Sequence, residues 1–352
     1  MKIQLAAVVS LFAATSFAQL QETSFYAVRP IQGNPPVIDG KILDDPAWEQ
    51  AERHTNYYVY LDQNPGPSKT KTEFRMLYDD KGLYLAVLNW GDTSKLKAVV
   101  TRPDDPNLWS DDSAELYFDN FCTGLQYRKF MVNSKGTRAD TYQFDPQNVS
   151  TSWNANGWTN GTLVLPNPEK PEEGCWTIES FFPWEDLGGK AEPGEIRAFN
   201  HCRFSFGIWV LSTSSPGGGY YNPVRFGRIY FAPDHKKLDE KTIAKLLDSR
   251  TPPPWCMEVG DNLWKNETGK IECESLSEKI RRSEKDCAEQ LALVQQEMTG
   301  ASPARVKEFE KIQKEAPDEK AAGLNRAIRF DQYAAKLRNF YWELICDKTF
   351  KK

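Results

Sequence analysis

Short runs of alternating apolar and polar residues occupy most of the first two thirds of the chain. The run 113–119 has an apolar residue at every second position, with polar residues such as Glu115 between them. A β-strand repeats every two residues, so this run is predicted to be a half-buried strand. Runs 72–78 and 83–90, joined by Asp-Asp-Lys-Gly, predict a β-hairpin. Further runs of this kind are 128–134, 175–182, 204–212 and 225–231.

These runs predict a mainly β fold, an antiparallel β-sandwich over residues 19–235, because many short strands separated by Gly, Pro, Asn and Asp are typical of it. Beyond Asp234 lysine and glutamate become frequent, and apolar residues recur three or four positions apart. Residues 236–352 are therefore predicted to be a linker and a C-terminal helical region. Its role would be docking of a protein partner, oligomerisation or bracing.

Three features support the prediction for the C-terminal region. The proline-rich stretch 249–264 is predicted to be a linker or a bracing loop. Ser302 followed by Pro303 marks the start of a helix, because serine caps helices and proline fits their first position. One stripe of an amphipathic helix consists of Ala327, Phe330, Ala334, Leu337, Tyr341 and Leu344.

The first 18 residues have the build of a secretory signal peptide. They contain one early lysine, an apolar run, and the small residues Ser16 and Ala18 before Gln19. The run is shorter than the roughly 20 apolar residues of a membrane-spanning helix. The net charge is -5 and no basic tract occurs, which disfavours nucleic acid and membrane surfaces as partners. The mature chain is predicted to be secreted, either extracellular or periplasmic.

Cysteine and tryptophan narrow the candidate chemistry further. Seven cysteines occur without a Cys-x-x-Cys pair, which disfavours a zinc knuckle, and an oxidising compartment would allow disulfides among them. The eleven tryptophans either pack in a β-rich core or face a ligand. Four that lie in or beside alternating runs are predicted to be core residues: Trp48, Trp90, Trp176 and Trp209.

Five segments carry a resemblance to a known family. They are Val37–Ala51, Thr72–Val87, Trp109–Asp119, Phe130–Gly136 and Asn222–Phe231. In content and order they resemble carbohydrate-binding module family 9, which is part of the wider DOMON-like group; the helical tail lies outside the resemblance. The resemblance implies a β-sandwich that binds a mono- or oligosaccharide or a polysaccharide end. It also implies structural calcium ions, which several members of the family hold.

The resemblance assigns candidate sugar-binding residues. In the family a sugar ring lies between two aromatic side chains, and the matching positions here are Trp109 and Tyr220. Polar contacts are implied from Glu115 and Asn133. A pyranose packs its C–H face on a flat aromatic ring, while hydrogen bonds to its hydroxyls set specificity.

Two departures from the family concern the ligand. Met131 stands where the family has an arginine, and the segment 214–219, Ser-Ser-Pro-Gly-Gly-Gly, lacks the side-chain amides of some members. Other interpretations of the site residues stay open. Trp109 also fits a core or interface aromatic, Tyr220 a cover for the sheet edge, and Glu115 a solvated strand residue.

Two alternative functions are kept beside non-catalytic sugar binding. A glycoside hydrolase needs two carboxyl groups about 5–9.5 Å apart. Glu115 and Asp119 share a strand face but lie roughly 13 Å apart, so a hydrolase would need a partner from another strand. Some DOMON-like domains hold haem in electron transfer, and His201 with Met131 could be tried as its ligands.

Calcium ligands could come from the acidic pairs Asp44-Asp45, Asp104-Asp105 and Asp111-Asp112.

Overall fold

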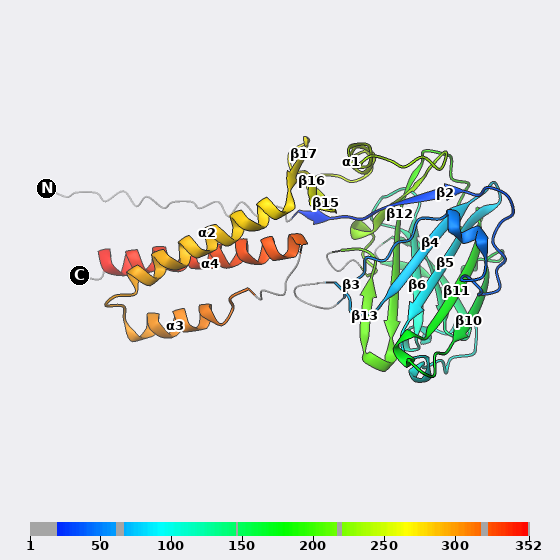
Figure 1. Cartoon of the computed structure of the whole chain (residues 1–352), viewed down its shortest axis with the longest axis horizontal. Helices are drawn as coiled ribbons and strands as arrows, with labels where there is room; N and C mark the ends of the chain where they lie inside the picture. Colours follow the sequence, from blue (N-terminus) through cyan, green and yellow to red (C-terminus); the bar gives the residue numbers. More distant parts are fainter. Residues whose placement is uncertain (1–19, 61–66, 146, 217–219, 318–322, 351–352) are drawn as a thin grey trace.

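The computed structural model describes residues 20–60, 67–145, 147–216, 220–317 and 323–350. It contains a β-sandwich, a small second sheet, and an arm of helices that extends from the small sheet away from the sandwich (Figure 1). The predicted fold class, an antiparallel β-sandwich with a C-terminal helical region, is confirmed. The predicted signal peptide lies outside the described residues.

The sandwich consists of two curled sheets that share strand β2 (Phe25–Pro30). β2 runs parallel to both of its neighbours, β4 and β14, whereas the other strand pairs of the sandwich are antiparallel. Beyond β2, the first sheet contains β4 (Thr72–Tyr78), β5 (Gly82–Trp90), β11 (Cys175–Pro183) and β10 (Thr159–Leu165). The second contains β14 (Gly227–Phe231), β12 (Ile196–Ser205), β6 (Ser113–Asp119), β7 (Tyr127–Asn133), β8 (Arg138–Asp145) and β9 (Asn148–Ser150). In addition, β13 (Val210–Thr213) pairs with β12, and β3 (Tyr58–Val59) pairs with β13.

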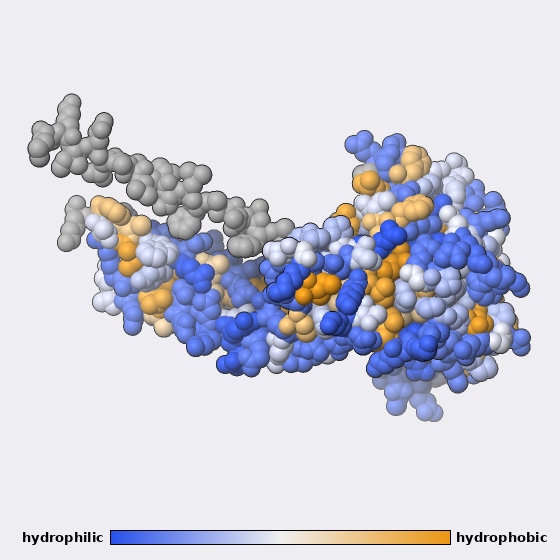
Figure 2. Space-filling view, turned by 90° about the horizontal axis from the view of Figure 1, so that it is seen from above, coloured by the Kyte–Doolittle hydropathy of each residue, from blue (hydrophilic) through white to orange (hydrophobic). Residues whose placement is uncertain are grey.

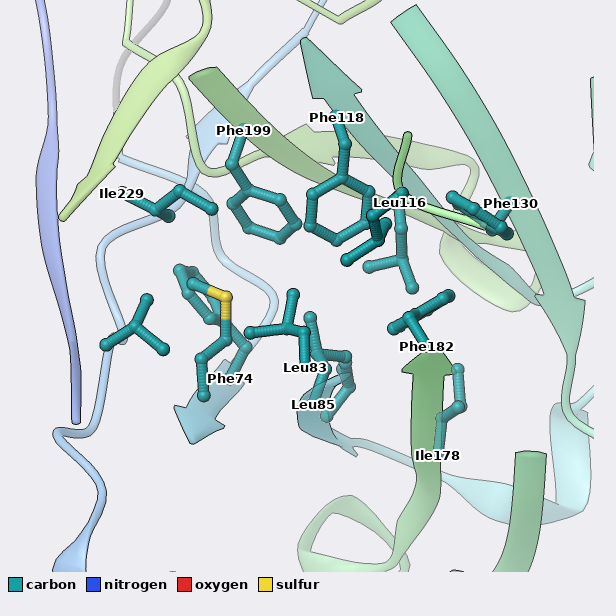
Figure 3. Close-up of a cluster of buried hydrophobic side chains, with 14 of the residues drawn as sticks. Phe74, Leu83, Leu85, Leu116, Phe118, Phe130, Ile178, Phe182, Phe199 and Ile229 are labelled. Atoms are coloured by element: carbon teal, nitrogen blue, oxygen red, sulfur yellow. The ribbon is translucent and has the colours of Figure 1, made fainter. Parts of the chain in front are cut away.

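Aromatic rings fill the space between the two sheets (Figure 3). The ring centroid of Phe118 lies 5.9 Å from that of Phe130, 5.5 Å from that of Phe182 and 5.0 Å from that of Phe199. These rings come from β6, β7, β11 and β12, so this one cluster joins both sheets. Burial of each ring contributes about 1.5–3 kcal/mol to folding.

Strand β6 is buried on both faces, where the sequence predicts a half-buried strand. On its inner face Leu116 belongs to the core between the sheets. On its outer face Tyr117 is 1% exposed and packs with Tyr127, Tyr220 and Phe226. The segment around η6 (Pro223–Arg225) covers this outer face, and such a cover comes from contacts that local alternation does not encode.

The run 204–212, predicted as one strand, is interrupted. Strand β12 ends at Ser205, the 3₁₀ turn η5 (Phe206–Ile208) follows, and β13 then returns antiparallel beside β12. Trp209 has φ +51° and completes the reversal. Its side chain is 72% exposed, so the predicted core position of Trp209 is wrong.

The other three tryptophans predicted to lie in the core are buried to different extents. Trp48 and Trp176 are 0% and 1% exposed, which confirms their prediction, whereas Trp90 is only partly buried.

The seven cysteines are free thiols in the described structure, so none of the disulfides that the compartment would allow is formed. Burial raises the pKa of the Cys122 thiol to about 11 and that of Cys175 to about 12.

Part of the predicted linker is a β-sheet. β15 (Trp255–Val259), β16 (Asn262–Asn266) and β17 (Ile271–Ser275) pair antiparallel, and β1 (Gln21–Glu22) pairs parallel with β15. The prolines end at Pro254, just before β15, so they do not interrupt the ladder. The interpretation of 249–264 as a loop is therefore wrong for its strand residues.

The arm contains three helices beyond α1 (Glu240–Asp248), namely α2 (Leu276–Glu297), α3 (Pro303–Gln313) and α4 (Gly323–Phe350). The hydroxyl of Ser302 accepts the Arg305 N–H at 3.4 Å, which confirms the predicted start of α3. Within the described residues, no helix combines the length and the apolar composition that crossing a bilayer requires. The core of the arm consists of Cys287, Val294, Phe309, Tyr333, Ala334, Leu337, Phe340 and Leu344.

Ion pairs link the helices of the arm outside this core. Their N···O distances are 2.6 Å for Arg326–Glu284, 3.0 Å for Arg338–Asp286 and 2.8 Å for Lys348–Glu297. Each pair joins α4 to α2. All six side chains retain solvent exposure, so each pair contributes at most about 1 kcal/mol.

Substitution Phe118→Ala should lower the free energy of unfolding by about 3–5 kcal/mol, because it empties the centre of the ring cluster. Phe121→Ala is the matched control, since the Phe121 side chain is 62% exposed, and it should change stability by less than about 0.5 kcal/mol. Urea unfolding followed by circular dichroism measures both. Equal losses for the two variants would contradict the assigned core.

A second prediction concerns Glu22 in β1. Burial, followed by the charge of Glu258, raises the pKa of Glu22 from 4.5 to about 8. Its contribution to stability is therefore complete below pH 4.5 and is lost as the pH rises to about 8. Glu22→Gln should remove this dependence and leave the variant more stable than the parent above that range by at least about 1 kcal/mol. Urea unfolding across the range measures it; Glu310→Gln, at an exposed position, should retain the parent's slope.

Candidate functional site

The candidate site begins at the turn that leads into β6. The 3₁₀ turn η3 (Leu108–Ser110) packs against β6 and β7. Leu108 is fully buried and packs with Met131 and Ala139, which anchors the turn on the outer face of the sheet. The next side chain, Trp109, is 53% exposed. The turn therefore presents an indole ring to solvent beside the outer face of β6.

Glu115 is the buried charge on this outer face. It is 4% exposed, and its Oε2 receives Lys129 Nζ at 2.7 Å and the hydroxyl hydrogen of Tyr117. Lys129 lies on β7, directly opposite Tyr117 in the strand register. Within the described residues Glu115 Oε1 receives no hydrogen bond. This oxygen is thus available to accept one from a ligand.

Asn133 connects the segments around the turn. It is 0% exposed, and its Nδ2 donates to the Val100 carbonyl and to Asp111 Oδ2, both at 3.0 Å. Its Oδ1 accepts the N–H groups of Lys135 at 3.1 Å and Thr137 at 3.0 Å. Asn133 therefore holds the turn after β7 to the segment that leads into η3.

Tyr220 lies just before η6, in the segment that covers the outer face of β6 and is called the outer-face cover below. It is 5% exposed, and its ring centroid lies 4.8 Å from that of Tyr60 and 6.4 Å from that of Tyr117. Burial, with the charge of Glu115 as the next cause, raises the pKa of Tyr220. The Tyr220 hydroxyl has no hydrogen-bond partner among the described residues. The adjacent Tyr221 is 60% exposed.

Trp209 is a second exposed indole near the same end of the sheet. Its ring centroid lies 5.2 Å from that of Phe204, whose backbone pairs with Ser113 at the start of β6. Because paired residues share a face, Phe204 points outward like Glu115. Trp209 therefore stands over the end of β12 that adjoins η3.

The four residues assigned from the resemblance thus differ in how deeply the structure buries them. Of the four, only Trp109 is exposed, at 53%; Glu115, Tyr220 and Asn133 are 4%, 5% and 0% exposed. Sequence reasoning missed Lys129, whose pairing with Glu115 depends on strand register. It also missed Tyr117, although alternation places Tyr117 two positions from Glu115 on the same face.

The carboxylate of Asp119 is committed to a turn. Its Oδ1 accepts the Phe121 N–H at 3.1 Å and its Oδ2 accepts the Gly124 N–H at 2.9 Å. These bonds fix the loop after β6. Asp119 therefore serves the backbone, and Glu115 is paired with a lysine instead of a second carboxylate.

The haem alternative does not fit the fold. His201 pairs with Leu116 on the inner face, and its Nδ1 is hydrogen-bonded to the Tyr57 hydroxyl. Burial lowers the pKa of His201 to about 3. Met131 pairs with Glu115 on the outer face. Side chains on opposite faces of one sheet cannot ligate one iron.

The acidic pairs proposed for calcium hold backbone groups instead. Asp45 Oδ1 accepts the Ala47 N–H at 2.8 Å, and Asp111 Oδ2 accepts the Val100 N–H at 2.9 Å. The described residues contain no group of three or more His, Cys, Asp and Glu side chains placed to hold a metal ion. These side chains do not fit a calcium site of their own, so calcium remains a prediction from the resemblance.

Comparisons with known proteins agree with the resemblance. A family described as carbohydrate family 9 binding domain-like matches residues 38–232. A carbohydrate-binding module of family 9 from Caldicellulosiruptor kristjanssonii, solved with glucose, is 18% identical, with 62% of this chain and 98% of that chain covered and a TM-score of 0.43. The same organism's module with cellotriose is 17% identical, with coverages of 61% and 97% and a TM-score of 0.42. A putative carbohydrate-binding protein from Bacteroides uniformis is 15% identical, with coverages of 59% and 99% and a TM-score of 0.47. Comparison with curated proteins gave no match.

Two neighbouring tyrosines provide a test of the site's layers. Tyr220→Ala should lower the free energy of unfolding by about 3–5 kcal/mol, because the ring is packed beneath the outer-face cover. Tyr221→Ala should change it by less than about 0.5 kcal/mol, because that ring faces solvent. Denaturant unfolding of both variants measures the difference. A stable Tyr220→Ala variant would contradict the packing described here.

Proposed function

The chain belongs to the carbohydrate family 9 binding domain-like family, and from this membership we propose that it is a secreted protein that binds a carbohydrate without turning it over. The observation that supports the proposal is the exposed indole of Trp109 on η3, a turn that packs against β6, the strand that carries the buried carboxylate of Glu115. An apolar platform next to a fixed polar acceptor suits a sugar ring, which has an apolar C–H face and a hydroxyl edge.

Trp109 supplies the platform in this proposal. The buried anchor Leu108 holds η3 in place, so the indole keeps its orientation without a ligand. Binding on a preorganised ring loses little conformational entropy. Trp209, at the adjoining end of β12, is the candidate for a second aromatic contact.

Glu115 accepts a hydrogen bond from a sugar hydroxyl through Oε1. Its other oxygen is held by Lys129 and Tyr117, which fixes the direction of the carboxylate. Tyr220 and Asn133 act as positioning residues in this arrangement. Tyr220 supports the outer-face cover, and Asn133 ties the segment before η3 to β7.

The way in which the carboxylates are used supports binding without turnover. A glycosidase needs an acid and a base flanking the bond. Here Glu115 is paired with Lys129, and Asp119 is bonded to backbone N–H groups. Incubation with plant polysaccharides and a reducing-sugar assay should give no release above the blank; clear release would favour the hydrolase alternative.

Secretion and partners complete the proposal. The leader-like residues 1–18 support export, and the net charge of -5 gives no footprint for nucleic acid or a membrane surface. The ligand is a mono- or oligosaccharide or a polysaccharide end. The helical arm is proposed to dock a protein partner.

Trp109→Ala should weaken sugar binding by about 1–4 kcal/mol, or tenfold to several-hundredfold, because one stacking face is lost. Stability should change by less than about 0.5 kcal/mol, since the ring is exposed. Calorimetric titration with glucose and cellotriose, the sugars of two similar solved structures, measures affinity.

Trp342→Ala is the matched control for this experiment. Trp342 is 57% exposed on α4, far from the outer face of β6, so its loss should leave sugar affinity unchanged. The proposal fails if Trp109→Ala retains full affinity, or if it unfolds the protein.

A further inference from the structure

A cleft lies at one end of the sandwich, between the two sheets, and is called the end cleft below. It has a volume of about 360 Å³ and is lined by the last residues of β5 and β12 and by Trp176 near the start of β11. Arg203 in its wall pairs with Ala114, whose side chain belongs to the core between the sheets. The end cleft is therefore on the inner side of the sheet whose outer side carries Glu115.

Three buried polar atoms on the inner side of the end cleft make no hydrogen bond within the described residues. They are Arg203 Nε, Trp176 Nε1 and Ser205 Oγ. The first two can only donate. A buried donor without an acceptor costs about 1–3 kcal/mol, so a cavity with several of them favours a ligand that brings acceptors.

Arg203 is held in place by the opposite sheet. It is 4% exposed, and its Nη1 donates to the Lys71 carbonyl at 3.1 Å and to Thr72 Oγ1 at 3.0 Å. Its Nη2 donates to the Trp90 carbonyl at 3.0 Å. These bonds fix the plane of the guanidinium and leave its Nε edge for a ligand.

The charges around the end cleft favour an anion because Arg203 is a buried cation that forms no ion pair within the described residues. Of the acidic residues in the lining, Asp112 accepts the N–H groups of Lys97 at 2.8 Å and Phe206 at 3.1 Å. Asp92 is paired with Lys95 at 2.9 Å, so these two charges cancel.

We propose that the end cleft binds an acidic sugar, a hexuronic acid unit, whose carboxylate accepts a hydrogen bond from Arg203. The indole N–H of Trp176 and the hydroxyl of Ser205 then meet the oxygens of the sugar ring and its hydroxyls. A cavity of about 360 Å³ exceeds the needs of a lone carboxylate, and its dispersed donors match a ligand with oxygens on several sides. This site is separate from the proposed outer-face site and does not depend on it.

The experiment uses the full chain and its Trp109→Ala variant, in which the outer-face site is disabled. Each is titrated calorimetrically with glucuronate, glucose and acetate. Glucuronate should bind the variant as it binds the parent, and the variant should bind it at least about tenfold more tightly than glucose or acetate. Three results overturn the proposal: no binding of glucuronate, which means that water alone fills the cleft; binding of acetate or glucose to Trp109→Ala as tightly as glucuronate; or loss of glucuronate binding in Trp109→Ala.

A second substitution tests the cleft wall. Trp176→Phe keeps an aromatic ring but removes one N–H donor, so glucuronate should bind about three- to tenfold more weakly. Trp342→Phe is the matched control and should leave the affinity unchanged. Circular dichroism confirms that both variants are folded. An unchanged affinity in folded Trp176→Phe overturns the assignment of the cleft.

Discussion

The burial of strand β6 on both faces is the constraint from which the rest of the sandwich follows. Its inner side chains, such as Phe118, hold the two sheets together, and its outer side chains carry a charge away from water. A buried carboxylate is costly unless it is paired. Lys129 and Tyr117 meet that requirement for Glu115 and also set the direction in which its remaining oxygen points. Stability and the candidate sugar contact therefore depend on the same residues.

The alternation of strand β12 separates the two candidate sites. Phe204 points outward and supports Trp209. Its neighbour Arg203 points inward and crosses to the first sheet through backbone carbonyls. One strand thus contributes an apolar support to one surface and a cation to the other. The two sites are chemically distinct because successive side chains on a strand face opposite ways.

Local rules predicted the elements that short segments determine by themselves. The hairpin of β4 and β5 and the start of α3 at Ser302 follow from alternation, turn residues and capping, and the structure has them. The burial of Tyr220 and the pairing of Lys129 with Glu115 depend on contacts between distant segments, which no local pattern encodes. Trp209 was misplaced because a reversal at positive φ interrupts a run that reads as one strand. The depth at which each of the four candidate residues lies therefore could not be predicted from the sequence, and their role in sugar binding stays a prediction.

The interactions within the arm and those within the sandwich respond differently to dissolved ions. The sandwich rests on apolar contacts between rings, which dissolved ions do not screen. The arm adds pairs such as Arg338–Asp286 between its helices, at positions that water and ions reach. Mobile ions attenuate such exposed pairs over about 8 Å at physiological ionic strength and over about 3 Å in molar salt. High ionic strength therefore weakens the ion pairs between the helices of the arm, while the apolar contacts of the sandwich are retained.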